Sequence, residues 1–164
     1  MEVPESERAV GELRLQHDSS AALGVPAHIT ILFPFVDGED VDERALEDLC
    51  SRFRPFDFQL DRVERFDDGV LWLHPEPSLP FVDLTTAVAQ RWPDHPPYEG
   101  MFDEPIPHLT VSETPIDVQF ELPISARVHE VALFEQDEET HRWSKRRAFP
   151  LGRPEPGSGC EPGS

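Results

Sequence analysis

The spacing of apolar residues along the chain predicts both helices and strands. Apolar residues recur every three to four positions in the stretches 5–18, 38–53 and 80–92, which is typical of amphipathic helices. Asp40 and Glu43 have the spacing of a capping box in the second stretch, and Ser78 is placed to cap the third. We expect the third helix to end before Pro93, because proline has no amide hydrogen to donate.

Alternating or continuously apolar stretches predict β-strands elsewhere. These stretches are 27–33, 56–66, 70–75, 108–113, 116–122, 127–136 and 140–152. The turn residues Asp-Asp-Gly join the second and third as a β-hairpin, and Asp-Glu-Glu-Thr joins the last two as another. The proline-rich connection at 93–107 is long and irregular, which is more typical of a functional or mobile loop than of a simple linker.

The chain length and composition predict one domain and a short tail. Its 164 residues suffice for a single domain with a substantial core, which we place at 1–152. The last stretch, 153–164, is poor in apolar residues and rich in proline and glycine, so we expect a disordered C-terminal tail. Neither a membrane span nor a signal sequence is predicted, so we expect a cytoplasmic monomer without a membrane partner.

The strong negative charge limits the possible partners. Against 33 acidic residues stand 14 basic ones, for a net charge of −19. Such a surface repels long polyanions, so a DNA duplex is not an expected partner, whereas a small phosphorylated ligand fits a local pocket. The acidity also fits adaptation to a saline cytoplasm. Cys50 and Cys160 are far apart and lack zinc-ligand spacing, so we expect neither a disulfide framework nor a metal site.

The candidate chemistry lies in two matching strand starts. The stretch "PAHITILFPF" at 26–35 places His28 and Thr30 on one strand face and Ile29, Ile31 and Phe33 on the other. The stretch "PIPHLTVS" at 105–112 repeats this order, with His108 and Thr110 following a proline. Each pair forms either a satisfied polar patch or half of an active site. Taken alone, each histidine is an ordinary strand-start residue, but the matched context favours a functional pair.

These paired motifs resemble the two-histidine phosphoesterase superfamily, and in particular its 2′-5′ RNA ligase-like branch. The stretches "GVPAHITILFPF", "LWLHPEPSLPF", "PPYEG" and "PHLTVSE" follow the order of that family between about residues 3 and 150. The resemblance implies an α+β fold with two pseudo-symmetric, duplicated lobes. In this fold antiparallel sheets form a central cleft and the helices lie outside.

The same resemblance implies the chemistry. His28 would donate a proton and His108 would act as base, while Thr30 and Thr110 would bind phosphate. Two imidazoles that titrate near neutral pH can open a 2′,3′-cyclic phosphate on a nucleotide or RNA end without a metal or cofactor, or ligate in reverse. The acid and base roles exchange for a substrate of opposite polarity. The alternative is a catalytically inactive module that binds a nucleotide or phosphometabolite.

The aromatic and basic residues leave more than one interpretation open. Phe35 and Tyr98 either contact the substrate, by stacking on a base or lining the cleft, or serve in packing. The basic residues of the last stretch either guide an RNA end, protect a sheet edge, or offset the acidic "DEET"; they are Arg142, Lys145, Arg146 and Arg147. We expect the remaining histidines to be surface or structural residues.

One departure from the family pattern concerns the start of the chain. Family members usually begin with a full apolar strand, whereas only "MEVPE" precedes the first predicted helix here. Either the start codon is assigned late or the sheet closes differently. An unpaired edge beside the first motif would weaken or abolish activity.

Overall fold

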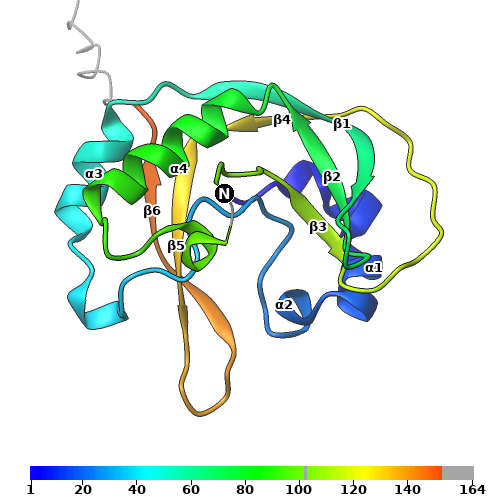
Figure 1. The fold of residues 1–164 in the computed structure, drawn as a ribbon, viewed down its shortest axis with the longest axis horizontal. Coiled ribbons are helices and arrows are strands. Elements are labelled where there is room, and N and C mark those ends of the chain that lie inside the picture. Colours follow the sequence, from blue (N-terminus) through cyan, green and yellow to red (C-terminus); the bar gives the residue numbers. More distant parts are fainter. Residues whose placement is uncertain (102, 153–164) are drawn as a thin grey trace, which may run out of the picture.

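Two antiparallel sheets form the framework of the protein, and the predicted α+β class is confirmed (Figure 1). The computed structural model describes residues 1–101 and 103–152. The larger sheet has the strand order β3-β2-β1-β4, and the smaller one pairs β5 with β6. The strands are β1 (Phe56–Arg65), β2 (Leu71–Glu76), β3 (Leu109–Ser112), β4 (Ile124–Val128), β5 (Glu130–Gln136) and β6 (Trp143–Pro150).

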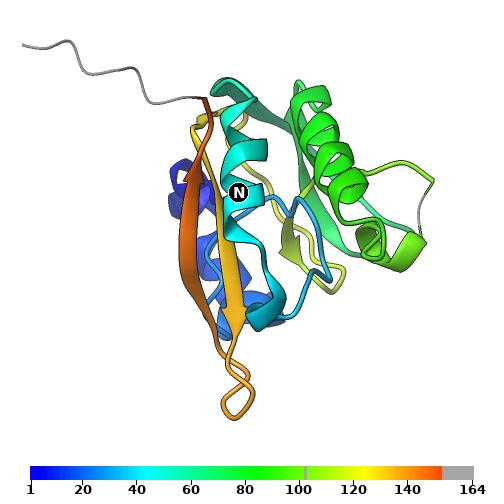
Figure 2. The same ribbon diagram turned by 90° about the vertical axis from the view of Figure 1, so that its left-hand side faces the viewer.

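Helices pack on both sheets. The three predicted helices correspond to α1, α3 and α4, and short helical turns lie between them. Their bounds are η1 (Pro4–Ser6), α1 (Glu7–His17), α2 (Ser19–Ala22), η2 (Gly38–Asp40), α3 (Glu43–Ser51), α4 (Leu79–Arg91) and η3 (Pro97–Gly100). Figure 2 shows α3 beside the β5–β6 hairpin and α4 on the side of the larger sheet. Within the described part of the chain, every helix is too short or too polar to cross a membrane.

Aromatic contacts hold α4 against the larger sheet. The ring of Phe81 on α4 packs edge-on against Phe56 and Phe58 of β1, at centroid distances of 5.1 and 5.0 Å. Phe58 and Phe81 are both buried, so the hydrophobic core lies between α4 and this face of the sheet. The opposite face of β1 and β2 therefore remains available for polar side chains.

The helix caps differ in part from the prediction. The prediction of a capping box that starts at Asp40 is wrong. Asp42 is the N-cap of α3, and its carboxylate accepts a hydrogen bond from the amide of Ala45 at 3.0 Å. Asp40 lies instead in the preceding turn η2, which shifts the helix start by two residues. Ser78 is the N-cap of α4 as expected, but its side chain makes no capping hydrogen bond. This helix ends at Arg91, before Pro93.

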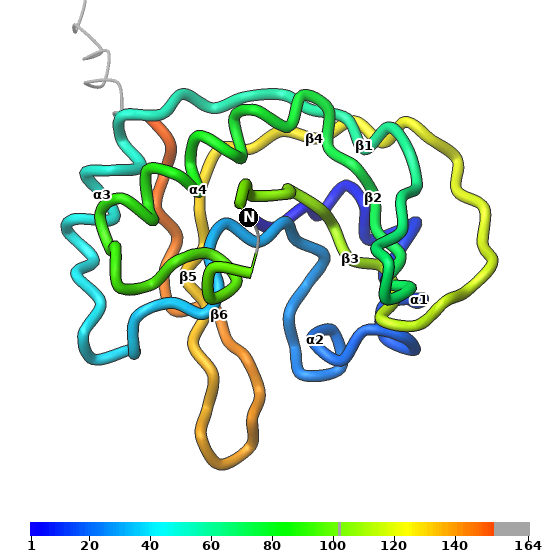
Figure 3. Tube along the Cα trace, in the orientation of Figure 1, coloured from blue at the N-terminus to red at the C-terminus, as the bar shows by residue number. Residues whose placement is uncertain are grey.

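The first motif segment is not a regular strand, contrary to the prediction for 27–33. Its only strand-type pairing among the described residues is one isolated bridge between Glu2 and His28. The amide of Val3 donates to the carbonyl of Ala27 and that of Ile29 to Met1, both at 2.8 Å. Figure 3 shows the N-terminal segment beside this part of the chain. The pairing is short because only residues 1–3 lie alongside, so a continuous ladder does not form.

The side-chain alternation of the first motif survives without the strand. Ala27, Ile29 and Ile31 are buried, whereas His28 and Thr30 are partly exposed. Phe33, which the alternation placed with the core, is 52% exposed. The predicted pattern is therefore confirmed up to Ile31 and wrong at Phe33.

The later strands also differ from the prediction. Residues 116–122 form no strand, although the alternating apolar residues of this stretch still pack on the core. The flanking residues Pro115 and Pro123 cannot donate amide hydrogen bonds to a ladder, which disfavours a strand here. The stretch 127–136 is divided between β4 and β5 at His129. The expected disordered tail, 153–164, lies outside the described residues.

Candidate functional site

The two motif histidines have the same local geometry. Nδ1 of His28 lies 2.8 Å from the carbonyl oxygen of Pro26, and Nδ1 of His108 lies 2.6 Å from that of Ile106. A carbonyl oxygen can only accept, so each Nδ1 carries the hydrogen and donates it. Each neutral imidazole therefore keeps a lone pair on Nε2, where it can take a proton. The repeated residue order thus gives a repeated tautomer.

Burial affects the protonation of both histidines. Burial, together with the nearby amino group of Met1, lowers the pKa of His28 to about 4, since burial disfavours the charged form and like charges repel. Burial also lowers the pKa of His108, although the hydrogen bond to Ile106 acts in the opposite direction. Both imidazoles are consequently neutral near pH 7 in the unliganded protein.

Three aromatic rings surround His108. Phe66 packs edge-on at a centroid distance of 5.1 Å, and Trp72 lies 5.8 Å away. Tyr98 stacks on the imidazole at 6.0 Å, with 28° between the ring planes. We call Phe66, Trp72 and Tyr98 the aromatic cage. These apolar surfaces exclude water, which accounts for the lowered pKa of His108.

The strand register places Trp72 beside the second motif. Trp72 on β2 pairs directly with Thr110 on β3, so both side chains lie on the same face of the sheet. Trp72 is buried, and its indole Nε1 has no hydrogen-bond partner among the described residues. Trp72 was not among the site residues predicted from the sequence. The alternation of Trp72 with Leu71 and Leu73 could have placed it on the face opposite the core.

A buried ion pair supports the first motif. Nη2 of Arg14 lies 2.8 Å from Oδ2 of Asp18, and both side chains are almost fully buried. Nη1 of the same arginine donates to the carbonyl of Val25, three residues before His28, at 3.2 Å. Arg14 therefore joins α1 to the segment that leads into the motif. Sequence reasoning missed this role, because an arginine on a short helix is usually exposed.

The structure gives the two predicted substrate contacts different surroundings. Tyr98 stacks on His108, and its amide donates to the carbonyl of Phe33 at 3.0 Å, so it contacts both motif segments. Its φ of 50° is in the left-handed region, which is uncommon for a residue with a side chain. Phe35 packs edge-on against Trp92 at 5.3 Å instead.

The basic residues of β6 form ion pairs with carboxylates outside the "DEET" turn. Arg146 and Arg147 each lie 2.9 Å from a carboxylate oxygen of Glu43 on α3. Lys145 lies 2.6 Å from a carboxylate oxygen of Glu2. These contacts hold β6 against α3 and the N-terminal segment. They favour a structural role over guidance of an RNA end.

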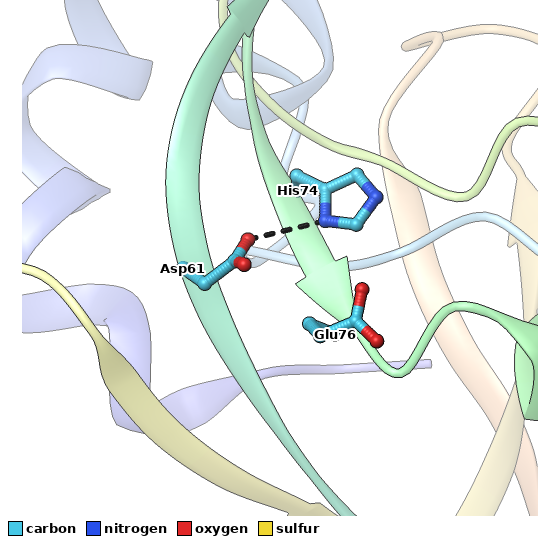
Figure 4. Close-up of side chains that lie close together, drawn as sticks. All are labelled: Asp61, His74 and Glu76. Carbon is cyan, nitrogen blue, oxygen red and sulfur yellow. Dashed lines mark hydrogen bonds and ion pairs between the residues drawn. The ribbon is translucent and has the colours of Figure 1, made fainter.

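A third histidine lies in a polar cluster on β1 and β2. Nδ1 of His74 is 3.1 Å from Oδ1 of Asp61, and Glu76 lies next to them (Figure 4). One ligand atom from each residue lies within 4.8 Å of the others, so this is the set in the described chain that could hold a metal ion. Sequence analysis placed His74 among the surface or structural residues.

Comparison with known proteins extends over most of the chain. Residues 3–140 match the model of the 2′-5′ RNA ligase superfamily. No curated protein matches the sequence significantly. Solved structures with the same fold include E. coli LigT complexed with 3′-AMP, at 19% identity and a TM-score of 0.62; the match covers 93% of this chain and 95% of LigT.

Two further solved structures have the same fold. A crystal structure described as a phosphoesterase matches at 20% identity and a TM-score of 0.61, covering 93% of this chain and 96% of its own. A protein of Thermus thermophilus, TT0787, matches at 17% identity and a TM-score of 0.55, covering 88% of this chain and 92% of its own. These likenesses establish the fold, and the family model extends over both histidine motifs. The chain therefore belongs to the 2′-5′ RNA ligase superfamily.

Proposed function

We propose that the protein hydrolyses a 2′,3′-cyclic phosphate on a nucleotide or RNA end, or forms a 2′-5′ bond in the reverse direction. The observation that carries this proposal is the matched pair His28 and His108, each with Nδ1 held by a backbone carbonyl and a lone pair on Nε2. Membership of the superfamily supports it. LigT, which has the same fold, was solved with 3′-AMP, with ATP and with phosphate.

The proposed reaction needs one base and one acid. Nε2 of His108 takes a proton from water, and the water oxygen forms a bond to phosphorus. The bond from phosphorus to one ribose oxygen breaks, and that oxygen takes a proton from protonated Nε2 of His28. Thr30 and Thr110 donate hydrogen bonds to non-bridging oxygens, where they stabilise the transition state. The products are a phosphomonoester and a free hydroxyl group, and no metal is required.

The protonation of His28 depends on the substrate. Its pKa is about 4 in the unliganded protein, so it carries no proton to donate near pH 7. A bound phosphate anion stabilises the imidazolium and raises this pKa. Charging of His28 is thus coupled to substrate binding in the proposed mechanism. For a substrate of opposite polarity, we propose that His108 acts as the acid and His28 as the base.

Two aromatic residues belong to the proposed substrate pocket. The contact of Tyr98 with His108 supports a place for Tyr98 in the substrate pocket. Phe35 is proposed as a second contact, with packing against Trp92 as its alternative role. We further propose a monomeric, cytoplasmic enzyme in which residues 1–152 form the phosphoesterase-like domain and whose ligand is a small nucleotide or an RNA terminus.

A second candidate is a nucleotide-binding module without catalysis. The neutral state of both imidazoles in the unliganded protein favours it, because a fixed acid is missing until a ligand raises the pKa of His28. In that case the site would bind a nucleotide or phosphometabolite and leave it unchanged.

Turnover and binding measured together distinguish the two candidates. We expect the wild-type protein to hydrolyse adenosine 2′,3′-cyclic phosphate, and His28→Ala and His108→Ala to lower kcat by about a thousandfold. His129→Ala is the matched control, because the side chain of His129 is 69% exposed on the protein surface. Circular dichroism checks that each variant is folded. Unchanged turnover in either motif variant would contradict the enzyme proposal, and saturable binding of 3′-AMP without any wild-type turnover would support the binding module.

A further inference from the structure

A third imidazole lies on the strand face that carries the second motif. Trp72 pairs with Thr110 and Leu73 pairs with Leu109, where the pairing ends, so His74 and His108 are the next residues along the two segments. The ring contacts agree with this placement, because Trp72 lies 6.1 Å from the ring of His74 and 5.8 Å from that of His108. Side chains two residues apart on a strand share a face, so His74 lies on the face of Trp72, whose ring contacts both histidines.

The tautomer of His74 is set in the same way as in the two motifs. Nδ1 of His74 lies 3.1 Å from a carboxylate oxygen of Asp61, which can only accept when ionised, so Nδ1 carries the hydrogen. Figure 4 shows the other ring nitrogen on the side of the ring away from Asp61. The side chain of His74 is 14% exposed, so part of it is accessible from solvent. Its neutral form therefore presents an acceptor at Nε2.

The charges around His74 are predominantly negative. Asp61 lies at a bulge in β1, and Glu76 follows His74 on the same strand. The guanidinium of Arg62 is bound to Asp61 at 3.3 Å and to Glu64 at 2.7 Å, and that of Arg127, which lines a pocket with Glu76, is bound to Asp57 at 2.8 Å. These four carboxylates against two guanidinium groups leave an excess of negative charge. Such a surface accepts hydrogen bonds from hydroxyl and amino groups and repels a phosphate.

We propose that Asp61, His74 and Glu76, here called the acceptor wall, select the substrate next to His108. This inference rests on the proposed function and narrows its substrate class. The acceptor wall binds the free hydroxyl of a 2′,3′-cyclic mononucleotide and excludes a phosphate at the same position. The 5′-oxygen of an RNA terminus carries a phosphodiester, so the mononucleotide is the preferred substrate. Asp61 acts through His74 as a positioning residue, whereas His74 and Glu76 contact the substrate.

The test compares two substrates that differ at one position. One is adenosine 2′,3′-cyclic phosphate with a free 5′-hydroxyl, and the other carries a 5′-phosphate in addition. With a chelator present, we expect kcat/KM of the wild type to be about tenfold higher for the first. Glu76→Gln and Asp61→Asn should each reduce this preference at least threefold, mainly by improving turnover of the 5′-phosphorylated substrate. Glu138→Gln in the exposed turn after β5 removes the same charge elsewhere and should leave the preference unchanged.

The role of His74 has its own test. His74→Leu should raise KM for the 5′-hydroxyl substrate severalfold at unchanged kcat, because an acceptor is lost while the catalytic pair is retained. His74→Gln keeps an acceptor and should recover most of the loss. A fall in kcat with unchanged KM in both variants would overturn this assignment.

Other outcomes overturn the inference as a whole. These are a wild type that prefers the 5′-phosphorylated substrate, or a preference that neither carboxylate variant changes. If added Mn²⁺ makes the wild type prefer the 5′-phosphorylated substrate, and Glu76→Gln abolishes this preference, the cluster is a cation site instead. If the wild type hydrolyses neither substrate, the proposed function fails. Calorimetry with 3′-AMP and adenosine 3′,5′-bisphosphate then decides the inference, because the acceptor wall should favour 3′-AMP.

Discussion

The two histidine motifs share their local geometry but differ in what surrounds them. Each imidazole donates from Nδ1 to the carbonyl two residues earlier in the chain. His28 lies in an irregular segment near the Met1 amino group and the Arg14–Asp18 pair, whereas His108 lies within the aromatic cage at the start of β3. The repeated sequence thus determines how each ring is held, and non-local residues determine its electrostatic environment.

This difference matters for the proposed reaction, which needs one acid and one base. An acid and a base require opposite protonation states, and two identical surroundings would not distinguish them. Burial lowers the pKa of both histidines, but the nearby Met1 amino group lowers that of His28 in addition, whereas apolar rings surround His108. A duplicated motif can therefore serve two roles because its two copies are packed differently. The following variants test this comparison.

The largest expected effect concerns the support of the first motif. Arg14→Met should lower the free energy of unfolding by about 3–5 kcal/mol, because it leaves the buried carboxylate of Asp18 without its partner. Urea unfolding measured by circular dichroism gives this value. Arg52→Met is the control: Arg52 is paired with Asp48 on the surface, where both side chains are at least 65% exposed, and the expected loss is below about 1 kcal/mol. Equal losses in the two variants would refute the structural role of Arg14.

The second effect is the pH dependence of stability. The pKa of His28 is about 4 in the folded protein and about 6.5 when unfolded, so below pH 6.5 the unfolded chain binds the extra proton. The contribution of a neutral His28 is therefore complete above pH 6.5 and is lost as the pH falls towards 4. Acidification from pH 7 to pH 4.5 lowers the free energy of unfolding of the wild type, and this decrease should be about 2 kcal/mol smaller in His28→Gln. Urea unfolding at both pH values measures the difference.

A surface histidine provides the control for this titration. The side chain of His129 is 69% exposed, so His129→Gln should lose as much stability on acidification as the wild type. If His28→Gln behaves like His129→Gln, the buried, neutral state assigned to His28 is wrong.

The sequence predicted the local features of both motifs because these depend on neighbouring residues. The order proline, histidine, aliphatic residue and threonine was enough to place His28 and Thr30 on the face opposite Ile29 and Ile31. The hairpin of β1 and β2 could be predicted equally well, because its turn residues lie between two apolar stretches. These predictions need only the period of a strand and the preferences of a turn.

The features that the sequence did not predict depend on distant residues. The segment at 27–33 has the alternation of a strand, but a ladder needs a partner, and only residues 1–3 lie beside it. The aromatic cage unites residues from the β1–β2 turn, β2 and the loop before β3, and no local pattern joins them. From the sequence His74 is an ordinary surface histidine, whereas the structure places its ring against Trp72, which also contacts His108. Tertiary pairing decides each of these cases.

The third effect compares the two threonines. Thr30→Val and Thr110→Val each remove one hydroxyl donor while keeping the size of the side chain, and each should lower kcat/KM about tenfold. Thr110 lies in β3 opposite Trp72, whereas Thr30 lies in an irregular segment. We therefore expect the loss from Thr110→Val to persist over temperature, and that from Thr30→Val to vary more. Steady-state hydrolysis of a 2′,3′-cyclic nucleotide at several temperatures measures both. An unchanged rate in one variant would show that only one motif binds phosphate.

The smallest effect tests whether the aromatic cage controls His108 alone. Phe66→Leu removes a ring that packs edge-on against His108, so water reaches the imidazole and its lowered pKa should rise towards the ordinary value of a histidine. Titration of the imidazole signals by NMR measures this shift. Phe35→Leu is the control, because Phe35 packs on Trp92. In both variants the pKa of His28 should stay unchanged, since burial and the Met1 amino group hold it low. A shift of equal size at both histidines would mean that the two motifs share one electrostatic environment, which contradicts the comparison.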